Sequence, residues 1–189
     1  MDEFNAMRAD PPRYARTLAA TRPRYDGRIL RGRSDTEIDI QTREGVAALD
    51  EAIAALRAAP AVPVLAPSEL LAGAARDHVA AQSRSGEMGH RSKGRDPGGR
   101  VVARGGGPYV GEVIGYGHSD PASAIELLLV DDGVPGRGHR HMMLDGRYRY
   151  AGAACGTHPV HRTMCVIMMS ETPDGSPPPP PRRGGGSPD

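Results

Sequence analysis

Residues 131–140 carry the sequence DDGVPGRGHR, which ends one predicted helix and opens a glycine-rich turn. An apolar helical pattern that includes Ile125, Leu128 and Leu129 runs up to this segment, and its Asp-Asp-Gly start is a stop signal. Within the segment, His139 is bracketed by glycine, so neighbouring side chains leave its imidazole unshielded. A histidine beside glycine is most often an ordinary loop residue, and a binding or catalytic role is the alternative.

Two other segments each carry an ionisable side chain beside glycine or among apolar residues. His90 follows Gly89 at the end of a predicted helix, and Glu112 lies in the otherwise apolar segment 109–116. Because burial of an unpaired carboxylate is costly, Glu112 is either exposed or held by a partner. Two imidazoles and one or two carboxylates in one cleft would suit a divalent cation or general acid–base catalysis. By contrast, His78 lies on the apolar face of its helix, which is typical of a core histidine.

The periodicity of apolar residues predicts helices and strands that are interleaved along the chain. The predicted helices begin near Thr42, near Ser68 and at Ser119 or Asp120, all residue types that cap helices. The predicted strands cover the ranges 37–40, 109–116, 150–155 and 164–169. Residues 91–108 are rich in Gly and Arg and predict a long surface loop. This order predicts an α+β class or a three-layer α-β-α arrangement.

The bulk composition narrows the class of protein. The chain has 189 residues, 38% of them hydrophobic, which suits one domain. Its 24 basic and 23 acidic residues nearly cancel, so we expect neither nucleic acid nor an anionic membrane surface as a partner. No apolar run reaches the about 18 residues that a membrane span needs. We expect one folded domain over residues 1–172 and a disordered Pro- and Gly-rich tail over residues 173–189.

The only two cysteines, Cys155 and Cys165, fall on the last two predicted strands. If the register allows it, a hairpin of these strands would bring the two Cα atoms within the about 5.5 Å that a disulfide prefers. The alternative is a pair of buried thiols, which behave as small apolar groups. We favour the disulfide, which would contribute about 2–3 kcal/mol by closing a loop of about ten residues.

Taken together, these segments resemble the CAP (SCP-like) superfamily, which contains cysteine-rich secretory proteins, venom antigens and plant pathogenesis-related proteins. Residues 4–8 resemble the first helix of CAP domains. The bacterial branch adds Gly-His after a helix, Gly-Glu at the start of a strand, and a long block similar to residues 131–140. The chain has Gly89-His90, Gly111-Glu112 and this block. The resemblance covers residues 4–170 and implies a three-layer α-β-α sandwich with a large central cleft.

The CAP resemblance also implies the residues of the cleft, which in the family holds two histidines and two acidic residues. The positions that match are His90, Glu112, Asp131 and His139. Asp131 is preferred as the second acid over Asp132 and Glu126. Some members bind zinc or magnesium through the histidine pair, which implies Zn²⁺ or another divalent metal held by His90 and His139. The chain departs from the family at Val113, where asparagine is common, and at His141, which adds a nearby imidazole.

For function, the resemblance implies a secreted binding module whose cleft holds a lipid, glycan or protein ligand, and we expect a monomer. The alternative is a metal-assisted hydrolase or peptidase that uses Glu112 as general base, although neither an H-E-x-x-H nor a G-x-S-x-G motif is present. A third interpretation is a purely structural extracellular domain tethered by its proline-rich tail. We expect secretion from the habit of the family alone, because residues 1–4 lack the basic and then apolar pattern of a signal peptide.

Overall fold

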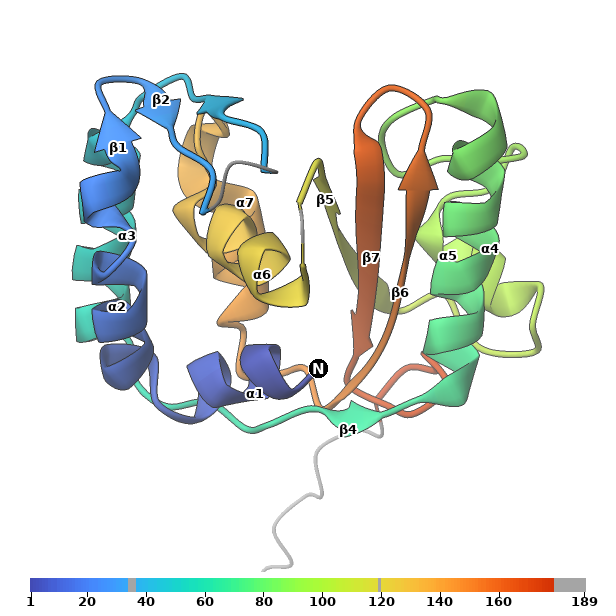
Figure 1. Cartoon of the computed structure of the whole chain (residues 1–189). Coiled ribbons are helices and arrows are strands. Elements are labelled where there is room, and N and C mark those ends of the chain that lie inside the picture. The colour runs from blue at the N-terminus through green and yellow to red at the C-terminus, as the bar shows by residue number, and fades with distance from the viewer. Residues whose placement is uncertain (34–36, 119, 179–189) are drawn as a thin grey trace, which may run out of the picture.

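The computed structural model describes residues 1–33, 37–118 and 120–178 and has one main sheet with helices on both sides (Figure 1). The main sheet has four strands in the order β4-β6-β7-β5. β4 pairs parallel to β6, while β6–β7 and β7–β5 are antiparallel. A small second sheet has the order β1-β2-β3. The strands are β1 (Tyr25–Asp26), β2 (Ile29–Leu30), β3 (Ile40–Gln41), β4 (Ala66–Pro67), β5 (Val110–Tyr116), β6 (Tyr150–His158) and β7 (Arg162–Ser170).

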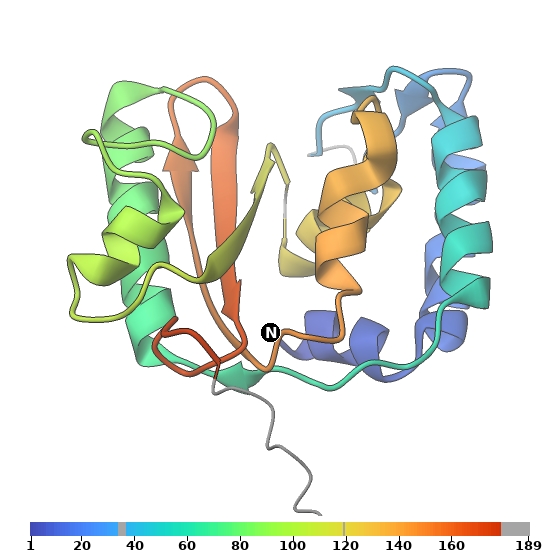
Figure 2. The ribbon, with the colours of Figure 1, turned by 180° about the vertical axis from the view of Figure 1, so that it is seen from behind.

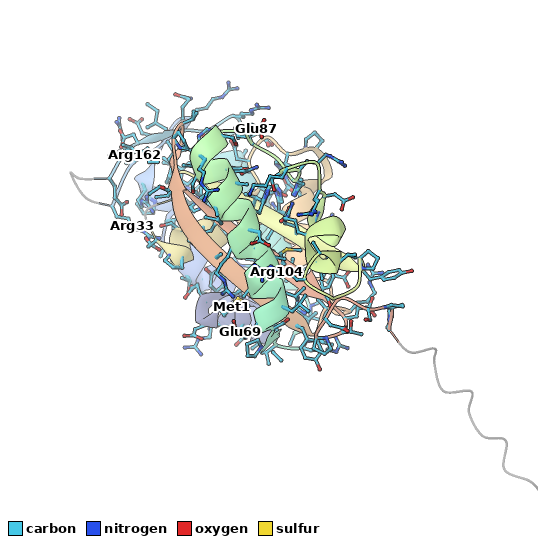
Figure 3. The ribbon with its side chains drawn as sticks, turned by 90° about the vertical axis from the view of Figure 1, so that its right-hand side faces the viewer. Met1, Arg33, Glu69, Glu87, Arg104 and Arg162 are labelled. Atoms are coloured by element: carbon cyan, nitrogen blue, oxygen red, sulfur yellow. A yellow bond between two sulfur atoms is a disulfide. The ribbon has the colours of Figure 1, made fainter. Side chains whose placement is uncertain are left out.

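The helices form two groups, α4 and α5 on one side of the main sheet and the rest on the other (Figures 1 and 2). They are α1 (Asp2–Ala9), α2 (Pro11–Ala19), α3 (Val46–Ala58), α4 (Glu69–Ser85), α5 (Pro97–Val102), α6 (Pro121–Val130) and α7 (Gly138–Met143), with 3₁₀ helices η1 (Arg22–Arg24) and η2 (Pro135–Arg137). Figure 3 shows α4 in front, with Glu69 near its start and Glu87 beyond its end. Across the described residues, no helix combines the length and apolar character needed to cross a membrane. The α+β class and the layered α-β-α arrangement are confirmed.

Two of the predicted start signals act as helix caps. The Ser68 hydroxyl accepts a hydrogen bond from the Leu71 N–H at 3.2 Å, which satisfies a free donor at the start of α4. The Asp120 carboxylate does the same for the Ser123 N–H at 2.8 Å in α6. Such caps involve residues three positions apart, so they can be read from the sequence.

Two predicted boundaries were wrong. Helix α3 begins at Val46 and not near Thr42, because the Thr42 hydroxyl instead donates to the Arg28 carbonyl at 2.6 Å. The strand predicted over residues 37–40 begins only at Ile40, as β3. Its partner β2 has two residues, and both pair with β3.

The segment 91–108, predicted as a continuous loop, contains helix α5. The Asp96 carboxylate accepts a hydrogen bond from the Gly99 N–H at 2.7 Å, and Pro97 occupies the first helical position. Proline is favoured there because its missing N–H has no helical partner to lose. The high glycine content concealed this start signal.

Alternating side chains on the strands divide the core between the two faces of the main sheet. In β5, Val113 belongs to a cluster with Leu49 and Leu129 on the side of α3 and α6. Its neighbour Ile114 belongs to a second cluster, with Leu71 of α4. The edge strand β5 is thus covered on both faces, and it separates the two halves of the molecule (Figure 2).

Arg8 of α1 is fully buried and connects three segments of the backbone. Its guanidinium donates to the carbonyls of Pro63, Met143, Asp145 and Tyr148 at 2.6–3.2 Å. Burial is the main cause that lowers the pKa of this arginine. The contacts fix the linker before β4 to the turn after α7.

The predicted hairpin and its disulfide are both confirmed. Cys155 of β6 lies directly opposite Cys165 of β7 in the antiparallel register. A disulfide joins them, with the two Cα atoms 4.1 Å apart.

The packed chain extends past the boundary that we expected after residue 172. The Gly107 N–H donates to the Asp174 carbonyl and the Tyr109 N–H to the Gly175 carbonyl, both at 2.9 Å. These bonds hold residues 173–176 against the segment before β5. Residues 179–189 lie outside the described residues, and their disorder stays a prediction.

Candidate functional site

The first histidine–carboxylate pair lies at β5, the edge strand of the main sheet farthest from β4 (Figure 2). His90 follows α4, and its Nδ1 lies 2.8 Å from Oε1 of Glu112. The Glu112 side chain is 1% exposed, whereas that of His90 is 49% exposed. Because an ionised carboxylate only accepts hydrogen bonds, Nδ1 is the donor and Nε2 is left to face a ligand.

Arg100 of α5 holds the other side of this carboxylate. Its Nη2 donates to Oε2 of Glu112, and its Nη1 donates to the His90 carbonyl at 2.8 Å. The Arg100 side chain is 3% exposed, so the ion pair is buried and the carboxylate is compensated. Arg100 was not among the predicted site residues, because α5 lies in the segment 91–108 that was predicted to be a loop. The Asp96-Pro97 signal places Arg100 in a helix and could have found it.

The loop that carries His90 is fixed through the Gly89 peptide, on which three side chains converge. Nε2 of His78 and Nε2 of Gln82 lie 2.9 and 2.7 Å from the Gly89 carbonyl, and the Gly89 N–H donates to the Tyr116 hydroxyl at 3.0 Å. Burial is the main cause that lowers the pKa of His78, and it therefore favours the neutral imidazole. Since a carbonyl only accepts, Nε2 of His78 carries the proton and Nδ1 accepts from Ser92. His78 is a satisfied core histidine, as predicted, and it positions the neighbouring site residue.

The second pair joins His139 of α7 to Asp131, which follows α6. His139 Nδ1 lies 2.7 Å from Oδ1 of Asp131, and the His139 N–H donates to Oδ2 at 2.9 Å. Asp131 adopts a left-handed backbone conformation, with φ of 56°, that ends α6. Its side chain is 2% exposed, while that of His139 is 27% exposed. Here too the carboxylate holds Nδ1 and leaves Nε2 for a ligand.

The two alternative acids are engaged elsewhere. Asp132 accepts from the backbone N–H groups of Arg43 and Glu44 at 2.6 and 2.8 Å, in the turn before α3. Glu126 pairs with Arg33 at 2.7 Å, and burial raises the pKa of its carboxyl group. Of the three candidates, Asp131 is the acid that contacts His139.

A groove of about 460 Å³ lies beside the Asp131–His139 pair. Its walls are largely apolar, with Ile38, Ile114, Leu127, Val134 and Val160 among them. The polar lining includes His139, Tyr116 and Arg162, but neither His90 nor Glu112. The Asp131–His139 pair therefore lines this groove, whereas the His90–Glu112 pair does not.

Comparison with known proteins places this architecture in a family. Residues 51–169 match the sequence profile of the CAP family, the cysteine-rich secretory protein family. The chain belongs to the CAP family. Similar solved structures include an extracellular SCP-domain protein from Bacillus anthracis, 22% identical over 58% of this chain and 34% of that one, with a TM-score of 0.48. An outer surface protein from Borrelia burgdorferi is 13% identical over 57% of this chain and 77% of that one, also with a TM-score of 0.48.

The CAP chain spans about a third of the length of the Bacillus protein, and no curated protein matches it. These structural likenesses concern the fold. The roles of the cleft residues rest on their own geometry.

The donor chemistry of the histidines suits a metal, but the described residues do not complete a metal centre. An imidazole whose Nδ1 is held by a carboxylate is the usual form of a metal-ligating histidine. However, no group of three or more His, Cys, Asp or Glu side chains in the described parts of this CAP domain is arranged to hold an ion. A metal at His90 and His139 stays a prediction, and no chemical step is derived through it.

A smaller chamber of about 210 Å³ adjoins the groove, and His118 lines both. The His118 side chain lies against Gly115, where a Cβ atom would come within 2.3 Å of its ring. Burial lowers the pKa of His118, and neither ring nitrogen has a hydrogen-bond partner of normal geometry among the described residues. No sequence motif predicted a role for His118.

Proposed function

We propose that this CAP domain is a secreted binding module whose groove holds a small amphiphilic ligand, with His139 as the polar anchor. The observation that carries the proposal is the fixed imidazole at an apolar groove. Asp131 occupies Nδ1 and the backbone N–H of His139, so the ring is oriented before a ligand arrives. Nε2 of His139 bonds to none of the described residues, and it supplies one directed hydrogen bond.

The lining of the groove favours an amphiphile over a glycan. A volume of about 460 Å³ lies in the range of small-molecule sites. The aliphatic walls provided by Ile38, Ile114 and Val160 favour burial of an alkyl chain. Three carboxylates also line the groove, Asp39, Asp131 and Asp132, but each of them has a partner among the described residues. The side chain of Arg162 bonds to none of the described residues, so the lining favours a ligand whose head is neutral or anionic.

The surroundings of Glu112 do not favour the hydrolase alternative. A general base needs an oxygen within hydrogen-bond reach of the attacking water. Both oxygens of Glu112 are engaged, one by His90 and one by Arg100, and the side chain is 1% exposed. Its role in this proposal is to orient His90.

The disulfide supports secretion. Disulfides persist in oxidising compartments and are rare in the cytosol of most organisms. The bond between Cys155 and Cys165 joins two adjacent strands of the main sheet, and Cys155 is exposed.

The binding proposal is tested by fluorescence titration with dansyl-labelled undecanoic acid. We expect saturable binding, and we expect His139→Ala to raise Kd at least about tenfold, the equivalent of about 1.4 kcal/mol. His141→Ala is the matched control, because it removes an exposed imidazole from the same helix and should leave Kd unchanged. Absence of saturable binding, or an equal effect of the two variants, would contradict the proposal. Calorimetry with chitotriose tests the glycan alternative.

The metal prediction has its own test. Zinc content is measured after equilibration and gel filtration for the parent chain, His90→Ala and His139→Ala. Equal zinc content in all three proteins would reject the two-histidine site and leave the groove proposal intact.

A further inference from the structure

The outer edge of β6 is unpaired along most of its length. β4 covers only the start of this strand, where Ala66 pairs with Tyr150 and Pro67 with Ala151. Beyond that point β6 continues to His158 with β7 on one side, and no other described strand pairs with it (Figure 1).

The direction of the backbone groups follows from the contact at Ala151. The Ala151 carbonyl accepts the Ser68 N–H at 2.8 Å, on the side of the strand away from β7. Because a strand repeats every two residues, Ala153, Cys155 and Thr157 point their N–H and C=O groups the same way. No hydrogen bond within the described chain reaches these groups in Ala153 or Cys155. The hydroxyl of Ser83 does reach the Thr157 carbonyl, at 2.5 Å.

This edge lacks the features that usually protect an exposed strand. Natural edges carry lysine, proline or a bulge that prevents pairing with another chain. Residues 150–157 read YAGAACGT, without a charge or a proline, and the register with β7 is continuous. On one face, the glycines let α4 pack directly against β6, where a Cβ atom at Gly152 would collide with the backbone of Ala72. The open backbone groups are therefore reached along the edge and from the opposite face, that of Ala153 and Cys155.

An apolar pocket of about 160 Å³ lies next to the open edge. Ala153, Cys155 and Ile167 form its wall on the sheet, and Phe4 and Ile125 form part of the opposite wall. A residue added opposite Ala153 or Cys155 would place its side chain on this same face of the sheet. The edge therefore provides backbone hydrogen-bonding groups, and the pocket beside it provides a site for one side chain.

The short length of the open segment decides the kind of partner. It is bounded by Ser68 at one end and by the turn after His158 at the other, which leaves about five residues or roughly 17 Å. In a twofold pair of β6 strands centred on Cys155, the second copy's hairpin turn would collide with Ser68. This clash disfavours a second copy in that register, whereas a short extended peptide can end before Ser68.

We propose that the open edge of β6 is a peptide-binding site that adds a short extended segment as a further strand. The peptide bonds to the backbone of Ala153 and Cys155 and inserts one aliphatic side chain of leucine or valine size between Phe4, Ile125 and Ile167. This site is separate from the groove at His139, so it does not depend on the function proposed for that groove.

The test uses the full chain and a displayed library of random nine-residue peptides. Ala153→Pro removes only the outward N–H, because proline is tolerated where a strand N–H faces away from its neighbour. Ala153→Ser is the matched control and keeps that N–H. We expect enriched peptides that contain an aliphatic residue within an extended, proline-free core. We expect their Kd to rise at least tenfold for Ala153→Pro and to change less than twofold for Ala153→Ser.

A second measurement does not depend on the variants. With a bound enriched peptide, amide hydrogen exchange of Ala153 and Cys155 should slow at least tenfold, and N-methylation of the peptide at alternate residues should abolish binding. The proposal is overturned if no enriched peptide distinguishes the two variants, or if N-methylated peptides bind equally well. Slow exchange at both amides in the free protein, together with a dimer in sedimentation, would also overturn it in favour of self-pairing.

Discussion

The buried ion pair between Arg100 and Glu112 allows a quantitative test of the site. Both side chains are at most 3% exposed, and Arg100 also satisfies the His90 carbonyl. Removal of one partner from a buried pair leaves an uncompensated charge and costs about 3–5 kcal/mol. We expect Arg100→Met and Glu112→Met each to lower the free energy of unfolding by about this amount.

The double variant should lose far less than the sum of the two single variants. Replacement of a buried pair by apolar side chains of similar volume is often close to neutral. If the double variant loses about 1–2 kcal/mol, the coupling energy is at least about 4 kcal/mol. Urea unfolding followed by circular dichroism measures all four proteins, with the disulfide kept oxidised and the slope m compared between them.

The exposed pair of Arg22 and Asp50, whose side chains are 57% and 47% exposed, provides the control cycle. Solvent screens such pairs, so this cycle should show no measurable coupling. Additive effects of Arg100→Met and Glu112→Met, with coupling below about 0.5 kcal/mol, would refute the idea that Arg100 compensates the Glu112 charge.

Three further predictions concern stability. Arg8→Met should lower the free energy of unfolding by about 3 kcal/mol or more in urea, because it leaves four carbonyls, one of them in a fully buried hydrogen bond, without their donor. A loss within about 1 kcal/mol would contradict this role. Replacement of Cys155 and Cys165 by alanine opens a loop with a sequence separation of 10, and should cost about 3 kcal/mol and lower Tm by about 5–10 °C in calorimetry. Burial lowers the pKa of His78 in the folded state, so the unfolded chain binds the extra proton first as pH falls. The contribution of neutral His78 to the free energy of unfolding is therefore complete above about pH 6.5 and is lost below it. His78→Gln should flatten the dependence of this free energy on pH between about pH 5 and 7. Equal slopes of free energy against pH in the parent chain and the variant would disprove the prediction.

Much of the fold follows from interactions between residues that are close in the chain. The caps at Ser68 and Asp120 act over three residues, and largely apolar runs mark β5 and β7. The pairing of Cys155 with Cys165 follows from a single tight turn. Such local signals were sufficient to predict these elements and the hairpin that carries the disulfide, but they did not reveal α5 or the short strands β1, β2 and β4.

The composition of the cleft depends on contacts that the local sequence does not specify. Asp131 and Asp132 are adjacent and chemically identical, yet Asp132 is turned away by backbone donors 88 and 89 positions earlier in the chain. Arg100 reaches Glu112 only because α5 packs beside β5. Motifs therefore identify His90, Glu112 and His139 as candidates, whereas the packing of distant helices selects Asp131, supplies Arg100 and forms the groove. The physical reason is that a buried charge pairs with whichever groups are packed next to it away from water. Those neighbours come from elements that are distant in the sequence, so they are known only from the folded structure.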